Sequence, residues 1–234
     1  MTTQTNRLVW TTAIIFGLAG LALQWWRMTS LTSSMDQGIL FQILWNGLHG
    51  HPFESTLSSQ LSTNVVHAGE LPQLGYHRLG QHFTPILVVW LPLISLFGKW
   101  FLPLLQILLI TGAGLLLYQL SKELLSKQLA LMLTFSFYGA NAVIGPMLGN
   151  FADFSQLPLA VFALLLGLQK RQSWLIAIAA IAIPLIREDT GVVLLGVGVW
   201  LAVRDRSRLW LAVLLMLWGC GYVLIATNIL MPLF

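Results

Sequence analysis

Long apolar runs, separated by short polar stretches that hold most of the charges, limit what this chain can fold into. About 20 consecutive apolar residues are enough to cross a bilayer as a helix, whereas a soluble domain needs charge over its whole surface. Only 9% of the 234 residues are charged and 57% are hydrophobic. The sequence therefore predicts an all-α integral membrane protein that forms a single membrane domain over 1–234. Its net charge of +4 does not indicate a nucleic-acid partner.

The apolar segments differ in length, and one of them decides the topology. The segments are 8–26, 83–97, 99–120, 129–147, 157–169, 173–186, 190–203 and 209–230. Segment 83–97 is short, contains two prolines and is separated from the next run only by Gly98 and Lys99. Whether it crosses the membrane decides on which side of the membrane each later loop lies.

The distribution of lysine and arginine settles this choice, because both prefer the cytoplasmic side. If 83–97 lies in the outer face, eight of the 12 basic residues are cytoplasmic: Arg7, Lys122, Lys127, Lys170, Arg171, Arg204, Arg206 and Arg208. If it crosses, only Arg7, Lys99 and Arg187 are. We therefore predict about seven transmembrane helices in the cell (inner) membrane, with the N-terminus cytoplasmic and the C-terminus extracytoplasmic. The loop 27–98 then lies outside, with membrane-lying or re-entrant helices at 35–49 and 83–97.

This topology places most of the chemically useful side chains on one side of the membrane. Six of the eight acids share the outer face: Asp36, Glu54, Glu70, Asp153, Glu188 and Asp189. All five histidines do so too: His49, His51, His67, His77 and His82. Any chemistry is therefore expected outside.

Each outer polar group also has a structural interpretation. Ser34 to Gln37 fits a helix capping box, with Asp36 in the first turn of an amphipathic helix, and Asp153 with Gln156 resembles another cap. Arg187 lies close to membrane depth, where an ion pair with Glu188 or with Asp189 would explain it. The histidine spacings are weak indications of a metal site.

Four motifs, taken in order, resemble one family: "MDQGILFQILWN" (35–46), "GQHFTPILVVWLPL" (80–93), "GNFADFSQLPL" (149–159) and "IREDTGVVLLGVGVWLAVR" (186–204). This is domain of unknown function family 2079, a set of membrane proteins of bacteria and archaea. That family is similar to the C-type glycosyltransferase superfamily, whose members have a seven-span module with an acid just after the first span and often a second acid in the next outer loop. The resemblance implies a C-type glycosyltransferase-like fold.

The resemblance also implies a function and assigns roles to residues. It implies transfer of a sugar from a polyprenyl-phosphate donor to an acceptor on the extracytoplasmic side, with Asp36 and Asp153 as the catalytic acids. Phosphate or substrate would be bound by Arg78, His82, Arg187, Glu188, Asp189 and Gln42. The cofactor is left open, with a divalent cation held by Asp36 and Asp153 as the candidate.

The motif around Asp153 departs from the family pattern, which continues Asp-Phe-His-Pro-Glu. Here Ser155, Gln156 and Leu157 follow Phe154, so the His and the Glu are missing. A non-catalytic lipid-binding or assembly subunit with the same fold is therefore the alternative function. The expected partners are membrane lipids, a polyprenyl-phosphate-linked sugar and a protein that supplies missing spans or an outer domain.

Overall fold

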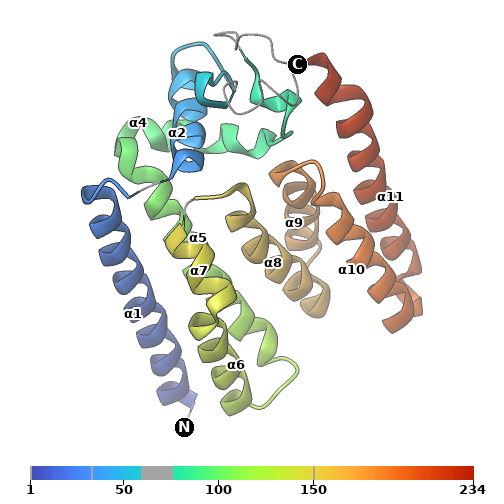
Figure 1. The fold of residues 1–234 in the computed structure, drawn as a ribbon. Coiled ribbons are helices and arrows are strands. Elements are labelled where there is room, and N and C mark those ends of the chain that lie inside the picture. The colour runs from blue at the N-terminus through green and yellow to red at the C-terminus, as the bar shows by residue number, and fades with distance from the viewer. Residues whose placement is uncertain (1, 33, 59–75, 150) are drawn as a thin grey trace. The chain divides into compact units, whose positions relative to one another are not determined.

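The computed structural model describes residues 2–32, 34–58, 76–149 and 151–234 (Figure 1). All the regular elements within these ranges are helical, and one isolated bridge joins Glu54 to His77. The all-α prediction is confirmed. Contacts divide the chain into two compact units, residues 1–37 with 99–179 and residues 38–98 with 180–234. The prediction of a single membrane domain stays a prediction.

The first unit is built around α5 (Phe101–Ser121). This helix packs against α1 (Thr2–Thr29), α6 (Lys127–Gly139) and α8 (Leu157–Lys170). Its Gly114 has no side chain where the ring of Tyr138 lies, and the Tyr138 hydroxyl donates to the carbonyl of Thr111 at 2.6 Å. The first unit also contains α7 (Asn141–Gly149), the short helix η4 (Asp153–Gln156) and the beginning of α9 (Ser173–Ile186).

The apolar run 129–147 is not one straight helix, because α6 and α7 meet at a bend of 42°. Ala140 between them has an extended backbone, with ψ of 132°. Gly139 and Asn141 are residues that commonly end and begin helices. These two residues account for the break inside a run that is a single apolar segment in the sequence.

The second unit combines short helices with an antiparallel helix pair. The short elements are α2 (Met35–Leu48), η1 (Arg78–Gly80), η2 (Pro85–Trp90) and α4 (Leu91–Phe97), and the pair is α10 (Gly191–Arg204) with α11 (Leu209–Ile225). The elements η3 (Gly98–Trp100), η5 (Arg206–Arg208), η6 (Ala226–Leu230) and η7 (Met231–Leu233) complete the chain. The helices predicted at 35–49 and 83–97 are thus present as α2 and as η2 with α4.

Glycines allow α10 and α11 to lie close together along their length (Figure 1). A Cβ at Gly191 would be 2.5 Å from the carbonyl oxygen of Gly219, and a Cβ at Gly198 would be 2.7 Å from that of Ala212. These distances are shorter than any van der Waals contact. The two backbones therefore approach as in other membrane helix pairs with small residues at the interface.

A proline in α9 is compensated by a side chain of α11. Pro184 has no N–H, so the carbonyl of Ala180, four residues earlier, lacks its helical donor. The indole Nε1 of Trp218 donates to this carbonyl at 2.9 Å. This bond ties the second half of α9 to α11 within the second unit.

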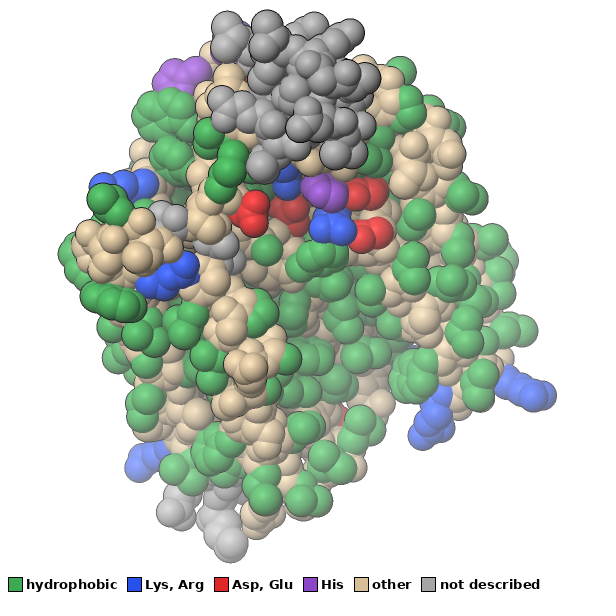
Figure 2. All heavy atoms as spheres, viewed as in Figure 1, with side chains coloured by type: hydrophobic (Ala, Val, Ile, Leu, Met, Phe, Trp, Pro, Cys, Tyr) green, Lys and Arg blue, Asp and Glu red, His purple; other side chains and the backbone are tan. Residues whose placement is uncertain are grey.

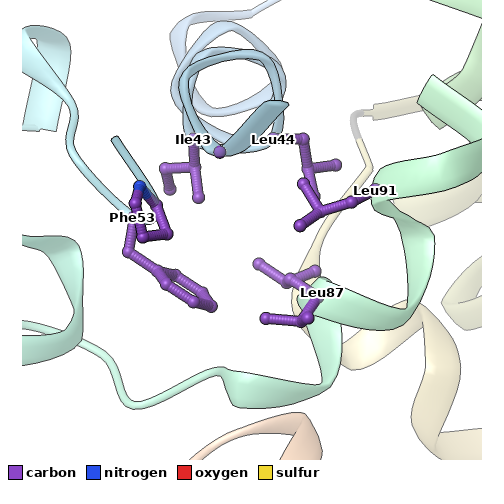
Figure 3. Close-up of a pocket in the computed structure, with 8 residues that line it drawn as sticks. Ile43, Leu44, Phe53, Leu87 and Leu91 are labelled. Atoms are coloured by element: carbon purple, nitrogen blue, oxygen red, sulfur yellow. The ribbon is translucent and has the colours of Figure 1, made fainter. Parts of the chain in front are cut away.

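An apolar hollow lies between α2 and the η2–α4 segment (Figure 3). Ile43 and Leu44 of α2 point toward Leu87, Leu91 and Phe53, and the other lining residues are also apolar or glycine. Gly47 lets Leu91 approach, since a Cβ there would lie 3.0 Å from the Leu91 side chain. The apolar stripe of α2 is therefore buried against protein here.

Length and composition identify three helices that can cross a membrane: Asn6–Thr29, Pro85–Ser121 and Arg206–Leu233. Counting α6 and α7 as one bent span gives four, whereas α9 and α10 are apolar but shorter. Hydrophobic side chains are spread over the face drawn in Figure 2, and charged ones are few. Among the described residues these features define a helical membrane protein, and the count of seven spans stays a prediction.

Candidate functional site

The turn between α9 and α10 carries three consecutive charged residues and is held by a buried threonine. The Thr190 hydroxyl donates to the carbonyl oxygens of Ile183 and Arg187, the latter at 2.7 Å. These carbonyls belong to the end of α9 or follow it, where helical donors are lacking. Thr190 thereby fixes the tight turn that presents Arg187, Glu188 and Asp189.

Arg187 is paired with both acids that follow it, and more closely with Asp189. Its Nε and Nη2 lie 3.1 Å and 2.8 Å from the two carboxylate oxygens of Asp189, which is a bidentate arrangement. Its Nε is 3.8 Å from Glu188 Oε1. Both pairings considered from the sequence are present, so the positive charge of Arg187 is largely balanced inside the turn.

Glu188 connects this turn to a segment more than 100 positions earlier in the chain. Its Oε1 lies 2.9 Å from Nδ1 of His82, and its Oε2 accepts the backbone N–H of Phe83 at 2.8 Å. Glu188 is only 8% exposed. Burial alone would raise the pKa of this carboxyl, but the hydrogen bonds and the attraction of His82 outweigh it and hold the pKa below its usual range.

Arg78 is held by neutral groups. Its Nη1 donates to Ser58 Oγ at 3.3 Å and to Gln81 Oε1 at 3.2 Å. Its Nε is buried without an acceptor, and none of the described acids forms an ion pair with it. A half-buried guanidinium that no described acid neutralises suits an anion such as phosphate.

Gln42 has a structural task in the second unit. Its side-chain oxygen accepts the hydroxyl of Ser55 at 2.8 Å and the N–H of Leu57 at 3.3 Å, and its nitrogen donates to Thr56 Oγ1 at 2.9 Å. These three bonds attach the turn after Phe53 to α2. The predicted role of Gln42 in binding substrate stays a prediction.

Asp36 and Asp153 belong to the first unit and have different surroundings. Asp36 lies in the first turn of α2, is exposed, and has neither an ion pair nor a side-chain hydrogen bond with any described residue. Asp153 begins η4 and is 5% exposed. The predicted cooperation of these two acids stays a prediction.

The cap predicted from Asp153 and Gln156 is replaced by a different one. The hydroxyl of Ser155 accepts the N–H of Ala152 at 3.4 Å, while the Gln156 amide donates to the backbone carbonyl of Asp153 at 3.3 Å. The N-cap position of η4 is Ala152 and the reciprocal side chain is that of Ser155, so the predicted cap of Asp153 with Gln156 is wrong by one position.

Three polar side chains outside the four motifs hold the end of α7, which precedes Asp153. The carbonyls of Pro146, Met147 and Gly149 end α7 and have no helical donors. They accept from Gln106 at 2.9 Å, from Gln24 at 2.6 Å and from Arg27, respectively. The sequence indicates that these glutamines need polar partners, because they lie within apolar spans. It does not identify the partner carbonyls, which depend on the fold.

The histidines do not form a metal site in the described part of the chain. His51 Nδ1 and His77 Nε2 lie 3.2 Å and 3.9 Å from Glu54, but no group of three His, Cys, Asp or Glu there has an arrangement that holds a metal ion. His67 and Glu70 lie outside the described residues.

The structure therefore brings His82, Arg187, Glu188 and Asp189 together, with Arg78 close to His82 in the chain. A helical membrane protein with a compact ionic cluster at helix ends is the class that the fold and this cluster define. The chain belongs to the family described as predicted membrane protein (DUF2079), whose profile matches residues 27–234. No curated protein and no solved structure is significantly similar to it.

Proposed function

We propose that this protein is a membrane glycosyltransferase that moves a sugar from a polyprenyl-phosphate donor to an acceptor hydroxyl on the extracytoplasmic side. The reaction class comes from the similarity of the sequence motifs to the C-type superfamily. The observation that supports it best is the state of Asp36, an exposed carboxylate at the start of α2 that forms no ion pair with a described residue. Among the described acids the others have partners, which would weaken them as bases.

In this proposal Asp36 accepts the proton of the acceptor hydroxyl as its oxygen attacks the anomeric carbon. The bond between that carbon and the phosphate oxygen breaks, and its electron pair stays on the phosphate. Asp153 is the second acid. Arg78 is the main cation for the departing phosphate, because its charge is not balanced by a described acid, whereas that of Arg187 is.

A divalent cation would find oxygen ligands in Asp36 and Asp153, and it would polarise the acceptor hydroxyl. No described group of three potential ligands is arranged to hold one. The proton transfer proposed above therefore uses only the carboxylate of Asp36.

The proposed topology has seven spans in the cell (inner) membrane, with the N-terminus cytoplasmic and the C-terminus outside. The 21 residues of α5 suffice for one crossing. The preceding residues 85–97 are then available to lie in the outer face, and Gly98, with a φ of 53°, separates the two parts.

Lipid analysis tests this proposal. The protein is purified in native-like lipid, and co-purifying lipids are identified by mass spectrometry for wild type, Asp36→Asn and the control Asp205→Asn, whose acid pairs with Arg208. We expect a polyprenyl phosphate or its glycosylated form in all three, with a higher ratio of glycosylated to free phosphate only in Asp36→Asn. Bulk phospholipids alone in every sample would contradict the transferase.

The alternative is a non-catalytic lipid-binding or assembly subunit. The network of His82, Glu188, Arg187 and Asp189 favours it, because these four groups already bind one another and leave fewer contacts for a substrate. The missing His and Glu after Asp153 point the same way. A polyprenyl lipid whose glycosylated fraction is the same in wild type and Asp36→Asn would support this function over catalysis.

A further inference from the structure

The contact between His82 and Glu188 has the geometry of an imidazole oriented by a carboxylate. Oε1 of Glu188 is 2.9 Å from Nδ1 of His82. Its Oε2 is fixed separately by the N–H of Phe83, and Nε of Arg187 stands 3.8 Å away from Oε1. The carboxylate is thus held from several directions, and the imidazole is held by the carboxylate.

This arrangement determines which nitrogen of His82 carries hydrogen. Because the pKa of Glu188 is lowered, its carboxylate is ionised at neutral pH and can only accept hydrogen bonds. Nδ1 of His82 must therefore donate. A neutral imidazole that donates through Nδ1 has its lone pair on Nε2, and the protonated ring has a second N–H there.

The second nitrogen, Nε2, is accessible. The His82 side chain is 30% exposed. Nε2 has no hydrogen-bond partner among the described residues, and it is not among their buried unpartnered atoms. Bonding at one nitrogen and exposure at the other is the arrangement that Ser-His-Asp sites use to fix the reactive tautomer.

We infer that Glu188 is a positioning residue that presents Nε2 of His82 for proton exchange with a phosphate ester bound at the outer face of the second unit. The identity of this ligand rests on the proposed function. As the sugar–phosphate bond breaks with its electron pair on the phosphate, Nε2–H of the imidazolium donates its proton to that oxygen. A phosphate monoester monoanion and a neutral imidazole result, and the imidazole regains a proton from water.

The other titratable groups described near the pair are Arg187 and Asp189 of the same turn and the hydroxyl of Tyr222 in α11, while Arg78 lies four positions before His82 in the chain. Tyr222 lies within electrostatic range of Glu188, and its ring centroid is 6.5 Å from that of Phe83. Arg187 is bound to Asp189 and Arg78 to Ser58 and Gln81. His82 thus keeps Nε2 available for a ligand, since none of these described groups is bonded to it.

Glu188→Gln is a sharp test because it preserves size while reversing the hydrogen-bond pattern. If the new amide oxygen accepts the N–H of Phe83, the amide nitrogen faces Nδ1 of His82 and can only donate. Nδ1 must then accept, so the hydrogen moves to Nε2 in the neutral ring. Glu188→Asp retains the charge and serves as the conservative variant.

The measurement is ¹⁵N NMR of histidine-labelled protein in nanodiscs, with His82 assigned by its loss in His82→Gln. We expect the Nδ1–H tautomer in wild type, the Nε2–H tautomer in Glu188→Gln, and recovery of Nδ1–H in Glu188→Asp. Glu123→Gln is the matched control, because Glu123 pairs with Lys170 in the first unit. The same tautomer in wild type and Glu188→Gln would overturn the inference.

Two probes distinguish the source of the phosphate: undecaprenyl phosphate in the nanodisc and inorganic phosphate in solution. Either should shift the Nε2 resonance of wild-type His82 more than the Nδ1 resonance, and a response to undecaprenyl phosphate alone would identify a lipid ligand. No response of Nε2 to either probe would overturn proton exchange with phosphate.

Sugar transfer then separates this inference from the proposed function. We expect Glu188→Gln to lower turnover by about 10²-fold or more, in the range of general acid–base contributions, with KM little changed. Transfer that keeps its rate and pH profile in Glu188→Gln would overturn the dyad and leave the transferase. An Nε2 response to phosphate without any transfer would support the dyad and count against the transferase.

Discussion

Charged residues in this protein have different environments. Within the described residues Asp36 is exposed without an ion pair, Arg78 is bound by neutral groups, and Arg187 is balanced by adjacent acids. The sequence predicted Asp36 to be catalytic, and it predicted both Arg78 and Arg187 to bind phosphate. The sequence predicted the pairing of Arg187 with adjacent acids but not the partners of Arg78, because those partners depend on which separate segments meet.

The partner of Glu188 illustrates this limit. The sequence places Arg187 and Asp189 beside it, and the turn does bring these side chains close. Its shortest hydrogen bonds, however, are with His82 and Phe83, which lie between η1 and η2. No local pattern encodes a contact across that distance in the chain.

The stability contribution of Glu188 should depend on pH in a defined direction. Its pKa is lower in the folded protein than in the unfolded chain, so the folded state is stabilised at pH values above the unfolded pKa, about 4.3. This stabilisation is lost as the pH falls through the folded pKa. We expect Glu188→Gln to lower the free energy of unfolding by about 1.5–3 kcal/mol at neutral pH, and by less at the acid end.

Thermal unfolding in detergent, followed by tryptophan fluorescence from pH 7 down to the acid limit of the wild type, measures this difference. Glu123→Gln removes an exposed ion pair with Lys170 and should change stability by less than about 1 kcal/mol. If the difference in stability between wild type and Glu188→Gln stays constant at acid pH, the lowered pKa of Glu188 is contradicted.

At the level of helices, hydropathy predicted the elements well and their interruptions poorly. The run 173–186 is α9 to the residue, and 190–203 is α10 shifted by one. The run 129–147 is broken at Ala140, and 209–230 changes from the α-helix α11 to a π-helical turn after Ile225. Breaks of this kind leave the apolar composition unchanged, so a hydropathy window does not detect them.

The close packing of α10 on α11 gives a prediction with an internal control. In Gly198→Ala the new Cβ would lie 2.5 Å from Met216 Cγ and 2.7 Å from the Ala212 carbonyl, so the helices must separate. We expect a loss of about 1–3 kcal/mol in the free energy of unfolding. Gly196→Ala, on the same helix, meets nothing within 4 Å and should leave stability unchanged or slightly raised.

Chemical unfolding of both variants in the same detergent checks this comparison. Equal stability of the two alanine variants would show that α10 and α11 are not packed through Gly198. A drop in both would point to a general requirement for glycine in α10.

The bond between Trp218 and Ala180 predicts a smaller effect. Trp218→Phe removes the donor to a carbonyl that Pro184 leaves without a helical partner, and we expect a loss of about 1 kcal/mol. Trp210→Phe is the control, because Trp210 is 78% exposed and has no described side-chain hydrogen bond. Thermal unfolding that lowers the melting temperature equally in both variants would mean that loss of indole area, and not the hydrogen bond, is responsible.

For the whole molecule, charge and helix length lead to different expectations about topology. Lysine and arginine positions predict seven spans, whereas length and composition select three helices, or four with the bent α6–α7 pair. The helices α9 and α10 have 14 residues each, about 21 Å, which is less than the roughly 30 Å of a hydrocarbon core. Short helices cross only if flanking turns or local thinning of the bilayer add the remaining length.

Single-cysteine labelling decides between these expectations. Cys220 is first replaced by Ala, and one cysteine at a time is then introduced as Ser126→Cys, Gln172→Cys, Ser207→Cys, His51→Cys or Asp189→Cys. If seven helices cross with the N-terminus inside, the first three sites react with a membrane-impermeant maleimide only after permeabilisation, because their basic loops are cytoplasmic. His51→Cys and Asp189→Cys should react in intact cells. If Gln172→Cys also reacts in intact cells, α8 and α9 do not both cross. The ionic cluster of the second unit would then need a different membrane placement, and the extracytoplasmic transferase would lose the sidedness on which it depends.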